Sequence, residues 1–455
     1  MILVELMYVI SVVLFILSLR WMSDVKTSRK GNSAGALGMI LAFIATIISI
    51  EMHRYDLVAI AIILGGLLGA IMALKMPMTA VPQRTAISHA FGSLAAALVG
   101  TAEYYQSVPD IDKFTMAVLS AEVILGYLTF TGSLIAFAKL QEIMSGRPFI
   151  YPGRRVISPI VFGSAVIIGI YLIFNPSSTS LFLIMATLSL LFGVLLVVAI
   201  GSADMPTVIA ILNSFAGLSA TGLGFILNNK LLIVAGSLDG SSGLILAIMM
   251  CKAMNRSFTN VLFGGFGQQQ KQDEKGTYKS IRECPIEEAA LILENANSII
   301  FVPGYGMAVA QAQHAVQELS ALLEKKGVRV SYAIHPVAGR MPGHMNVLLA
   351  EANVPYEQLY EMDRINDEFK NTDVAFVIGA NDVVNPAALK NKSSPIYGMP
   401  ILNAYEAKTV FVVKRSMNPG FAGIENELFN YPNTYMLFGD AKKVISDIAK
   451  QMKEL

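Results

Sequence analysis

The sequence predicts a multi-span α-helical membrane domain followed by an α/β domain with a doubly wound parallel sheet. The first observation is composition: the 455 residues are 54% hydrophobic and 15% charged, whereas soluble domains carry about 25% charged residues. The second is how the charge is divided. Residues 1–262 hold 15 Lys/Arg and 11 Asp/Glu, and residues 263–455 hold 19 and 22. The first part has membrane composition and the second has that of a soluble domain.

Net charge and cysteine content exclude two other classes of protein. A net charge of +1 gives no basic field for nucleic acid. The two cysteines, Cys251 and Cys284, cannot form a disulfide framework, and no metal-ligand spacing is present. We therefore expect no nucleic-acid partner and no metal.

Nine apolar runs are long enough to cross the hydrocarbon core, which takes about 20 residues. They are 2–22, 33–50, 57–76, 85–105, 115–138, 156–174, 181–201, 206–227 and 231–253. Odd-numbered loops and their helix ends carry ten Lys/Arg, against three in the even-numbered loops. The positive-inside rule then predicts an N-terminus outside the cell and a C-terminal half in the cytoplasm. The first run is too long for a cleavable signal peptide and lacks a basic start.

Polar and ionisable residues inside these spans are candidates for function, because charges at membrane depth are costly. They are His89, Glu122, Asn213 and Asp239, with Asp204 at a helix entrance. His89 suits a proton relay, because histidine titrates near neutral pH. A packed, neutral histidine that donates to a backbone carbonyl is the other interpretation. Glycine- and serine-rich stretches in the spans favour close helix packing, with a hydratable path as the alternative.

The second part begins after a polar linker at 263–283 and spans 284–455. Helices are expected at 286–295, from the first glycine loop to about Lys326, at 345–352 and at the C-terminus. Strands are expected at 298–302, 328–334, 374–378, 409–413 and 435–438. This alternation predicts a parallel sheet, in which ligands bind at the carboxyl ends of the strands.

Two of the loops that follow strands point to a nucleotide. Gly304-Tyr305-Gly306 joins a strand to a helix and forms a truncated dinucleotide fingerprint, which would let a pyrophosphate approach the backbone. A plain tight turn is the alternative. The second strand ends in Ile334-His335-Pro336, without the acid typical of NAD sites. Lys414-Arg415-Ser416 ends another strand and matches a 2′-phosphate, although a solvated basic turn remains open. Together they favour NADP(H) in a Rossmann-like domain.

Long motifs in both parts resemble the beta subunit of proton-translocating NAD(P) transhydrogenase. In the soluble part they lie at 302–313, 338–352, 379–386, 414–417 and 439–443, and in the membrane part at 203–206, 212–214, 240–243 and 252–257. The resemblance covers essentially the whole chain. It implies that the C-terminal domain binds NADP(H), in an orientation reversed from ordinary Rossmann sites.

The resemblance also implies residue roles. His89 and Asn213 match proton-path positions, Asp204 and Arg256 match positions that link the membrane to the nucleotide domain, and Asp382 lies near the nicotinamide. The implied cofactor-binding residues are Gly304, Tyr305, Gly306, Val337, Ala338, Gly339, Arg340, Met341, Pro342, Gly379, Ala380, Asn381, Asp382, Val383, Gly398, Met399, Lys414, Arg415, Ser416, Met417, Asn418, Pro419, Gly420, Phe421, Asp440 and Ala441. Residues 414–421 would close over the nucleotide as a lid.

This chain holds one nucleotide domain, so the resemblance places NAD(H) on a partner alpha subunit. It implies an oxidoreductase and translocase that transfers hydride from NADH to NADP⁺, supplies NADPH and moves protons inward. A dimer of alpha–beta units in the bacterial inner membrane is the implied assembly. Two departures stand out: Phe421 replaces the usual lid tyrosine, and Asp239 stands where an apolar residue is more common.

Two other functions fit parts of the sequence. An ion channel or transporter gated by a cytoplasmic NADP(H)-sensing domain would show a pore-filter loop or inverted repeats, and neither is evident. A membrane NADPH oxidoreductase that passes electrons to quinone would need a flavin, haem or cluster site. Two cysteines and five histidines without ligand spacing argue against it.

Overall fold

The computed structural model describes residues 2–24, 26–49, 54–77, 80–146, 148–201, 204–255, 281–341, 343–392, 394, 396–420 and 422–454. The chain divides into two compact units: Met1–Ser202 with Val208–Ala247, and Ala203–Thr207 with Ile248–Leu455. Most of the linker expected at 263–283 lies outside the described residues, so the domain boundaries stay a prediction.

Nine helices within the described residues are long and apolar enough to cross a membrane, which confirms the expected number of spans. They are α1 Ile2–Met22, α2 Ser28–Ser49, α3 Tyr55–Lys75, α4 Val81–Ser107, α5 Lys113–Leu140, α6 Arg154–Phe174, α7 Thr179–Val198, α8 Met205–Ile226 and α9 Lys230–Ala253. Several extend past their apolar run. Helix α5 begins earlier than expected because Asp112 caps it, accepting hydrogen bonds from the Phe114 and Thr115 amides.

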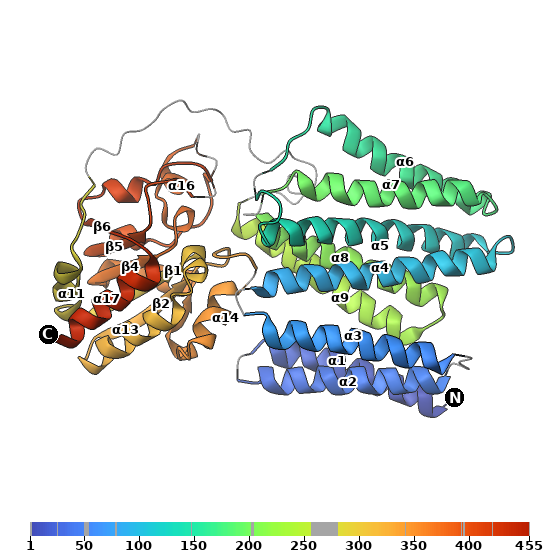
Figure 1. Ribbon diagram of the computed structural model, residues 1–455, viewed down its shortest axis with the longest axis horizontal. Helices are drawn as coiled ribbons and strands as arrows, with labels where there is room; N and C mark the ends of the chain where they lie inside the picture. The colour runs from blue at the N-terminus through green and yellow to red at the C-terminus, as the bar shows by residue number, and fades with distance from the viewer. Residues whose placement is uncertain are drawn as a thin grey trace. The chain divides into compact units, whose positions relative to one another are not determined.

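Helix α5 is the most enclosed span of the bundle. It packs against α4, α6 and α7, and small or polar residues such as Ser120, Gly126 and Ser133 are among those it buries. Helix α3 is the opposite case, because none of its residues is buried. In Figure 1, α1 to α3 lie at one edge of the helix group and α6 and α7 lie at the other.

Glycines hold α8 and α9 in backbone contact along their length. A Cβ added to Gly217 or Gly236 would overlap the backbone of the other helix, and one added to Gly243 would lie 2.7 Å from the Ser214 nitrogen. These positions therefore require glycine, because any side chain would push the helices apart. This contact supports the close-packing interpretation of the small residues.

The second unit contains a parallel sheet that is six-stranded in the described residues, with the order β3-β2-β1-β4-β5-β6. The strands are β1 Ser298–Pro303, β2 Arg329–Ile334, β3 Leu359–Glu361, β4 Val374–Ile378, β5 Thr409–Lys414 and β6 Thr434–Phe438. The doubly wound parallel fold is thereby confirmed. Strand β3 was not expected, because three residues at an edge carry no alternating pattern.

Alternate residues of β1, β2, β4, β5 and β6 enter two separate cores. Ile299 and Phe301 of β1 join the core beneath helices α11 Ile286–Glu294, α13 Gln313–Lys325 and α17 Ala441–Glu454. Figure 1 shows these helices on one face of the sheet. Ile300 and Val302 join the core on the other face, under shorter elements. Those elements are α15 Met362–Ile365, η4 Asn366–Asn371, η6 Ala404–Glu406 and η7 Glu427–Asn430.

The helix expected after the first glycine loop is broken into α12 Tyr305–Val309 and α13. Gln311 has φ +48° and ends α12. The Ala312 amide donates to Met307 O at 3.0 Å and the Gln311 amide to Ala308 O at 3.1 Å, which is the Schellman pattern of a helix end. Helix α14 His344–Glu351, η3 Tyr356–Gln358, η5 Asp382–Val384 and α16 Ala387–Lys390 complete the unit.

Candidate functional site

The loops that follow β1 and β4 meet at the centre of the sheet, where the winding reverses. The Gly304 amide donates to Ile378 O at 2.9 Å, and the Gly306 amide donates to Gly379 O at 2.9 Å. The crevice beside such a reversal is the usual ligand site of an open parallel sheet. The strand order therefore brings together two loops that are far apart in the sequence.

The glycines of these loops serve the contact between the loops themselves. A Cβ on Gly304 would lie 2.5 Å from the Ala380 nitrogen, and one on Gly306 would lie 2.7 Å from the Gly379 Cα. Gly379 itself has φ +66°, which disfavours any side chain. Because the loops touch, Gly304 and Gly306 present backbone to the pocket beside them.

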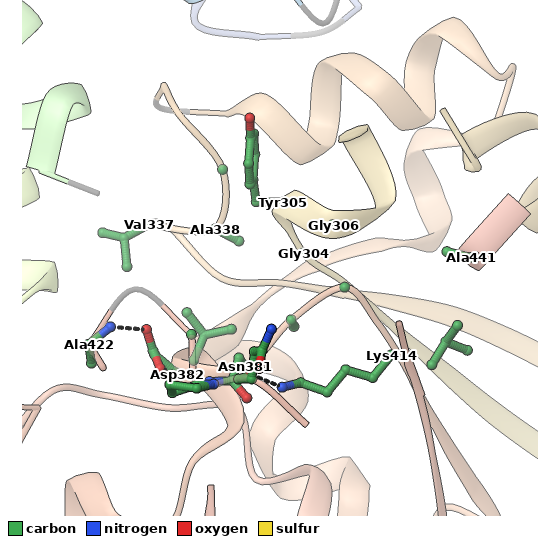
Figure 2. Close-up of a pocket in the computed structure, with 18 of the residues that line it drawn as sticks. Gly304, Tyr305, Gly306, Val337, Ala338, Asn381, Asp382, Lys414, Ala422 and Ala441 are labelled. Atoms are coloured by element: carbon green, nitrogen blue, oxygen red, sulfur yellow. Dashed lines mark hydrogen bonds between the residues drawn. The ribbon is translucent and has the colours of Figure 1, made fainter. Parts of the chain in front are cut away.

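A pocket lies at this edge of the sheet and draws on loops after β1, β2, β4, β5 and β6 (Figure 2). Many residues expected to bind the cofactor line it. They are Gly304, Tyr305, Gly306, Val337, Ala338, Gly339, Gly379, Ala380, Asn381, Asp382, Val383, Met399, Lys414, Arg415, Ser416, Asn418, Pro419, Gly420 and Ala441.

Other expected residues do not line the pocket. Asp440 instead caps α17, accepting from the Lys442 and Lys443 amides at 3.1 and 3.3 Å. Arg340, Met341, Gly398 and Met417 are also absent from the lining, and Pro342 and Phe421 lie outside the described residues. The sequence analysis missed Ala310, Ile396, Val413, Ala422 and Gly439, which also line the pocket. Val413 and Gly439 stand at strand ends, a position that could have identified them.

Basic residues end β5 beside the pocket. Lys414 is half-buried, whereas Arg415 and Ser416 are exposed. Lys414 Nζ donates to Asn418 O and lies 5.2 Å from the centre of the Phe429 ring. Burial lowers the pKa of Lys414, and the Asp382 carboxylate partly offsets this. An anion bound here would replace the water that the ammonium group has lost.

Hydrogen bonds join Ala422 and Asn426 to the loop that follows β4. The Ala422 amide donates to Asp382 Oδ2 at 2.9 Å (Figure 2). Asn381 Nδ2 donates to Asp382 Oδ1 at 3.0 Å, and Asn426 Nδ2 donates to Asn381 O at 2.9 Å. Asp382 therefore joins Ala422 to the loop that follows β4.

Buried histidines position the loop after β2. The Val337 amide donates to His335 Nδ1 at 3.2 Å, and His335 Nε2 lies 2.8 Å from Pro400 O. The Arg340 amide donates to His344 Nδ1 at 3.0 Å, and the Arg340 guanidinium lies 4.3 Å from the centre of the Tyr305 ring. Burial lowers the pKa of each histidine to about 4. Both rings are therefore neutral near pH 7, and these contacts fix Tyr305 and Val337 at the pocket.

The membrane unit holds a second group of polar side chains, on α4, α8 and α9. Asn213 Nδ2 donates to Asp239 Oδ1 at 3.1 Å and lies 3.4 Å from Asp239 O. His89 is half-buried, and its Nδ1 atom is buried without a hydrogen-bond partner among the described residues. No hydrogen bond joins His89 to Asn213 within the part of the chain that the structure describes.

Glu122 lies on α5 and is 1% exposed. Ser219 Oγ of α8 donates to Glu122 Oε1 at 3.1 Å, and Gly222 lies against the Glu122 stem. Oε2 is buried without a partner in the described residues. Asp204 directly precedes α8, while Arg256 lies outside the described residues.

Comparison with known proteins identifies the family. The family described as NAD(P) transhydrogenase beta subunit matches residues 4–451. A protein named NAD(P) transhydrogenase subunit beta from Rhodospirillum rubrum is 48% identical over 455 residues, covering 98% of each chain. The sequence of the same name from a designated strain of that species gives the same figures. The chain belongs to the NAD(P) transhydrogenase beta-subunit family.

Family membership bears on both the pocket and the apolar helices. A transhydrogenase beta subunit handles nicotinamide nucleotides and has an alpha subunit as its partner. The resemblance found in the sequence is thereby confirmed over nearly the whole chain. The nine apolar helices are those of a membrane protein.

Proposed function

We propose that this beta subunit binds NADP(H) in its C-terminal pocket and exchanges hydride with NAD(H) held by the alpha subunit. The transfer is coupled to inward proton movement through the membrane helices, and forward turnover supplies NADPH. The assembly is a dimer of alpha–beta units in the bacterial inner membrane. The N-terminus lies outside and the C-terminal domain lies in the cytoplasm, as the loop charges predict.

The observation that carries the choice of NADP(H) is Lys414-Arg415-Ser416 at the pocket. Two cations and a hydroxyl suit the 2′-phosphate, the group that distinguishes NADP from NAD. The end of β2 supports this choice. It offers His335, neutral and hydrogen-bonded to Pro400, where an NAD site tends to have an acid.

Hydride transfer depends more on the positioning of the nicotinamide ring than on acid–base catalysis. A bound nicotinamide supplies the hydride chemistry, and the protein places the ring and excludes water. The contacts between Asp382, Ala422 and Asn381 suit this task, because they hold Ala422 against the loop that follows β4. Tyr305 and Val337 form the opposite wall (Figure 2).

The membrane unit supplies the coupling in this proposal. His89 binds and releases the proton, Asn213 lies near its path, and Asp204 and Arg256 link the path to the nucleotide domain. One charge that crosses 100 mV is worth about 2.3 kcal/mol. At about 1.4 kcal/mol per decade, this shifts the product ratio roughly 40-fold toward NADPH.

The double variant Lys414→Ala/Arg415→Ala tests the cofactor. We expect it to weaken NADP⁺ binding by one hundredfold or so while NAD⁺ binding changes little, because each charge-assisted bond is worth about 1.5–3 kcal/mol. Calorimetry on the purified full-length chain measures both affinities. Arg364→Ala/Lys370→Ala removes the same charge from exposed residues that do not line the pocket, and it should leave both affinities intact. Equal losses for NADP⁺ and NAD⁺ would place the 2′-phosphate elsewhere.

A further inference from the structure

We propose that Asn385 and Asn426 are positioning residues of the nucleotide site. Their side chains join the loop that carries Asp382 to the segment that follows Ala422. The inference rests on the proposed binding of NADP(H) in the pocket and adds two residues to it. Neither asparagine lines the pocket, so each acts through the residues that do.

The amide group of Asn385 pairs with the backbone on both sides of Asn426. Asn385 Nδ2 donates to Glu425 O at 3.0 Å, and Asn385 Oδ1 accepts from the Glu427 amide at 3.4 Å. The same oxygen accepts from the Ala387 amide at 3.1 Å, within its own loop. One side chain thereby joins the loop after β4 to a segment that lies 40 residues later in the sequence.

The amide group of Asn426 makes the contact in the opposite direction. Asn426 Nδ2 donates to Asn381 O at 2.9 Å, and Asn426 Oδ1 accepts from the Leu428 amide at 3.0 Å. Each asparagine therefore uses its nitrogen to reach the other segment and its oxygen to order its own. An amide suits this task because it carries both donors and an acceptor. Together the two side chains form the asparagine junction between the loop after β4 and residues 425–428.

The asparagine junction is buried and anchored on both sides. Asn385 is 0% exposed and Asn426 is 1% exposed. Val384 on one side and Leu428 and Phe429 on the other belong to the same hydrophobic core. A buried amide that loses its partner stays unsatisfied, which costs more than the hydrogen bond itself contributes. The two segments are therefore held together firmly beside the pocket.

The asparagine junction supports the pocket residues next to it. Asn381, whose carbonyl accepts from Asn426, donates through Nδ2 to Asp382 Oδ1 at 3.0 Å. Asp382 Oδ2 accepts from the Ala422 amide at 2.9 Å (Figure 2). A Cβ added to Gly420 would overlap Asn381 Nδ2, so the backbone of that pocket residue also packs against Asn381. Loss of the contact from Asn426 therefore removes a support of Asp382.

A general contribution to folding is the competing explanation for two buried asparagines. It predicts a lower thermal stability and an effect on nucleotide release that is independent of Asp382. Positioning predicts instead that the effect on release passes through Asp382. A double-mutant cycle separates the two explanations, because only residues that act through each other give non-additive effects.

The experiment measures NADPH release from the purified full-length chain by stopped-flow fluorescence. We expect Asn426→Ala to speed release about tenfold, the equivalent of one lost hydrogen bond between buried groups. In the background of Asp382→Ala, the same substitution should add at most about twofold, because the side chain that it supports is already absent. Asn385→Ala should act in the same direction and show the same dependence on Asp382.

Three further variants serve as controls. Asn433 Nδ2 donates to Tyr405 O at 3.1 Å and to Ala407 O at 2.7 Å, where β5 and β6 begin and thus at the edge of the sheet opposite the pocket. Asn433→Ala should lower the thermal midpoint and release NADPH at the wild-type rate. Asn426→Asp keeps an acceptor, removes the donor and should reproduce the faster release. Asn430→Asp, which adds the same charge at an exposed position, should match the wild type.

Several results would overturn the inference. One is release from Asn426→Ala and Asn426→Asp at the wild-type rate. Another is release from Asn426→Ala/Asp382→Ala at the product of the two single effects, about one hundredfold above the wild type. Equally fast release from Asn433→Ala would assign the effect to the stability of the fold. A wild-type chain that does not bind NADPH would instead refute the proposed function.

Discussion

At the scale of single residues, Asp382 makes several interactions at the pocket. Its two oxygens accept from Asn381 and from the Ala422 amide, and its charge acts on Lys414. The sequence analysis placed Asp382 near the nicotinamide by resemblance. It could not show that the side chain also binds the Ala422 amide, because that contact depends on how a distant loop folds back.

Asp382→Ala should therefore speed the release of NADPH. Asp382 is half-exposed, so we take the lower end of the range for a hydrogen bond to a charged group, about 1.5 kcal/mol, or roughly tenfold in rate. Stopped-flow fluorescence of bound NADPH measures the rate. Asp382→Asn keeps one acceptor oxygen, so its rate of NADPH release should lie between those of the wild type and Asp382→Ala. Release from Asp382→Ala at the wild-type rate would show that this contact does not hold the nucleotide.

At the scale of elements, the sequence predicted whether a segment is a strand or a helix better than it predicted where the segment begins and ends. The buried runs at 298–302 and 374–378 could be recognised because apolar side chains fill both faces of a parallel sheet. The break between α12 and α13 could not, because Gln311 rather than glycine adopts the left-handed conformation. Both glycine loops were recognised, but the contact between Gly306 and Gly379 emerges only from the strand order.

Gly306→Ala tests the contact between these loops. The added methyl group would lie 2.7 Å from the Gly379 Cα, so the loops must separate. We expect a loss of about 1–3 kcal/mol in the free energy of unfolding and weaker NADP⁺ binding, measured by thermal unfolding of the full-length chain with and without nucleotide.

Gly327→Ala provides the control for this prediction. Gly327 has φ +88° and open space around it, so an alanine there strains the backbone without a steric clash. Its thermal midpoint should fall, but NADP⁺ should stabilise it as much as it stabilises the wild type. If NADP⁺ stabilised Gly306→Ala as much as Gly327→Ala, the contact between the loops would not contribute to nucleotide binding.

At the scale of the whole molecule, the number of spans and the order of the two parts followed from composition and run length. The membrane polar group was predicted only in part. His89, Asn213 and Asp239 were recognised as candidates, but the hydrogen bond between Asn213 and Asp239 was not predicted. Helix rotation decides which side chains face each other, and the weak periodicity of lipid-facing helices does not reveal it.

His89→Ala should abolish proton flux during turnover and slow forward transhydrogenation, while hydride exchange that needs no NADP(H) release persists. The reason is reciprocity: if the nucleotide changes the proton affinity of the membrane site, protonation changes nucleotide affinity equally. A pH-sensitive dye in sealed vesicles measures the flux. His314→Ala, on the exposed side of α13, should behave as wild type. Normal flux in His89→Ala would assign the relay to Glu122 or Asp239.

The glycine contacts between α8 and α9 have a mechanical consequence. Two helices in backbone contact cannot slide past each other without separating, so this hairpin moves as one stiff rod. Asp204 precedes the rod at Met205, and the chain leaves the rod at Ala253, at the same end, where Thr207 Oγ1 donates to Met254 Sδ at 3.4 Å. A displacement at that end therefore reaches Asn213 and Asp239 as a rigid rotation. Enlarging Gly217 to alanine should loosen the rod, so that nucleotide turnover no longer moves protons in fixed proportion.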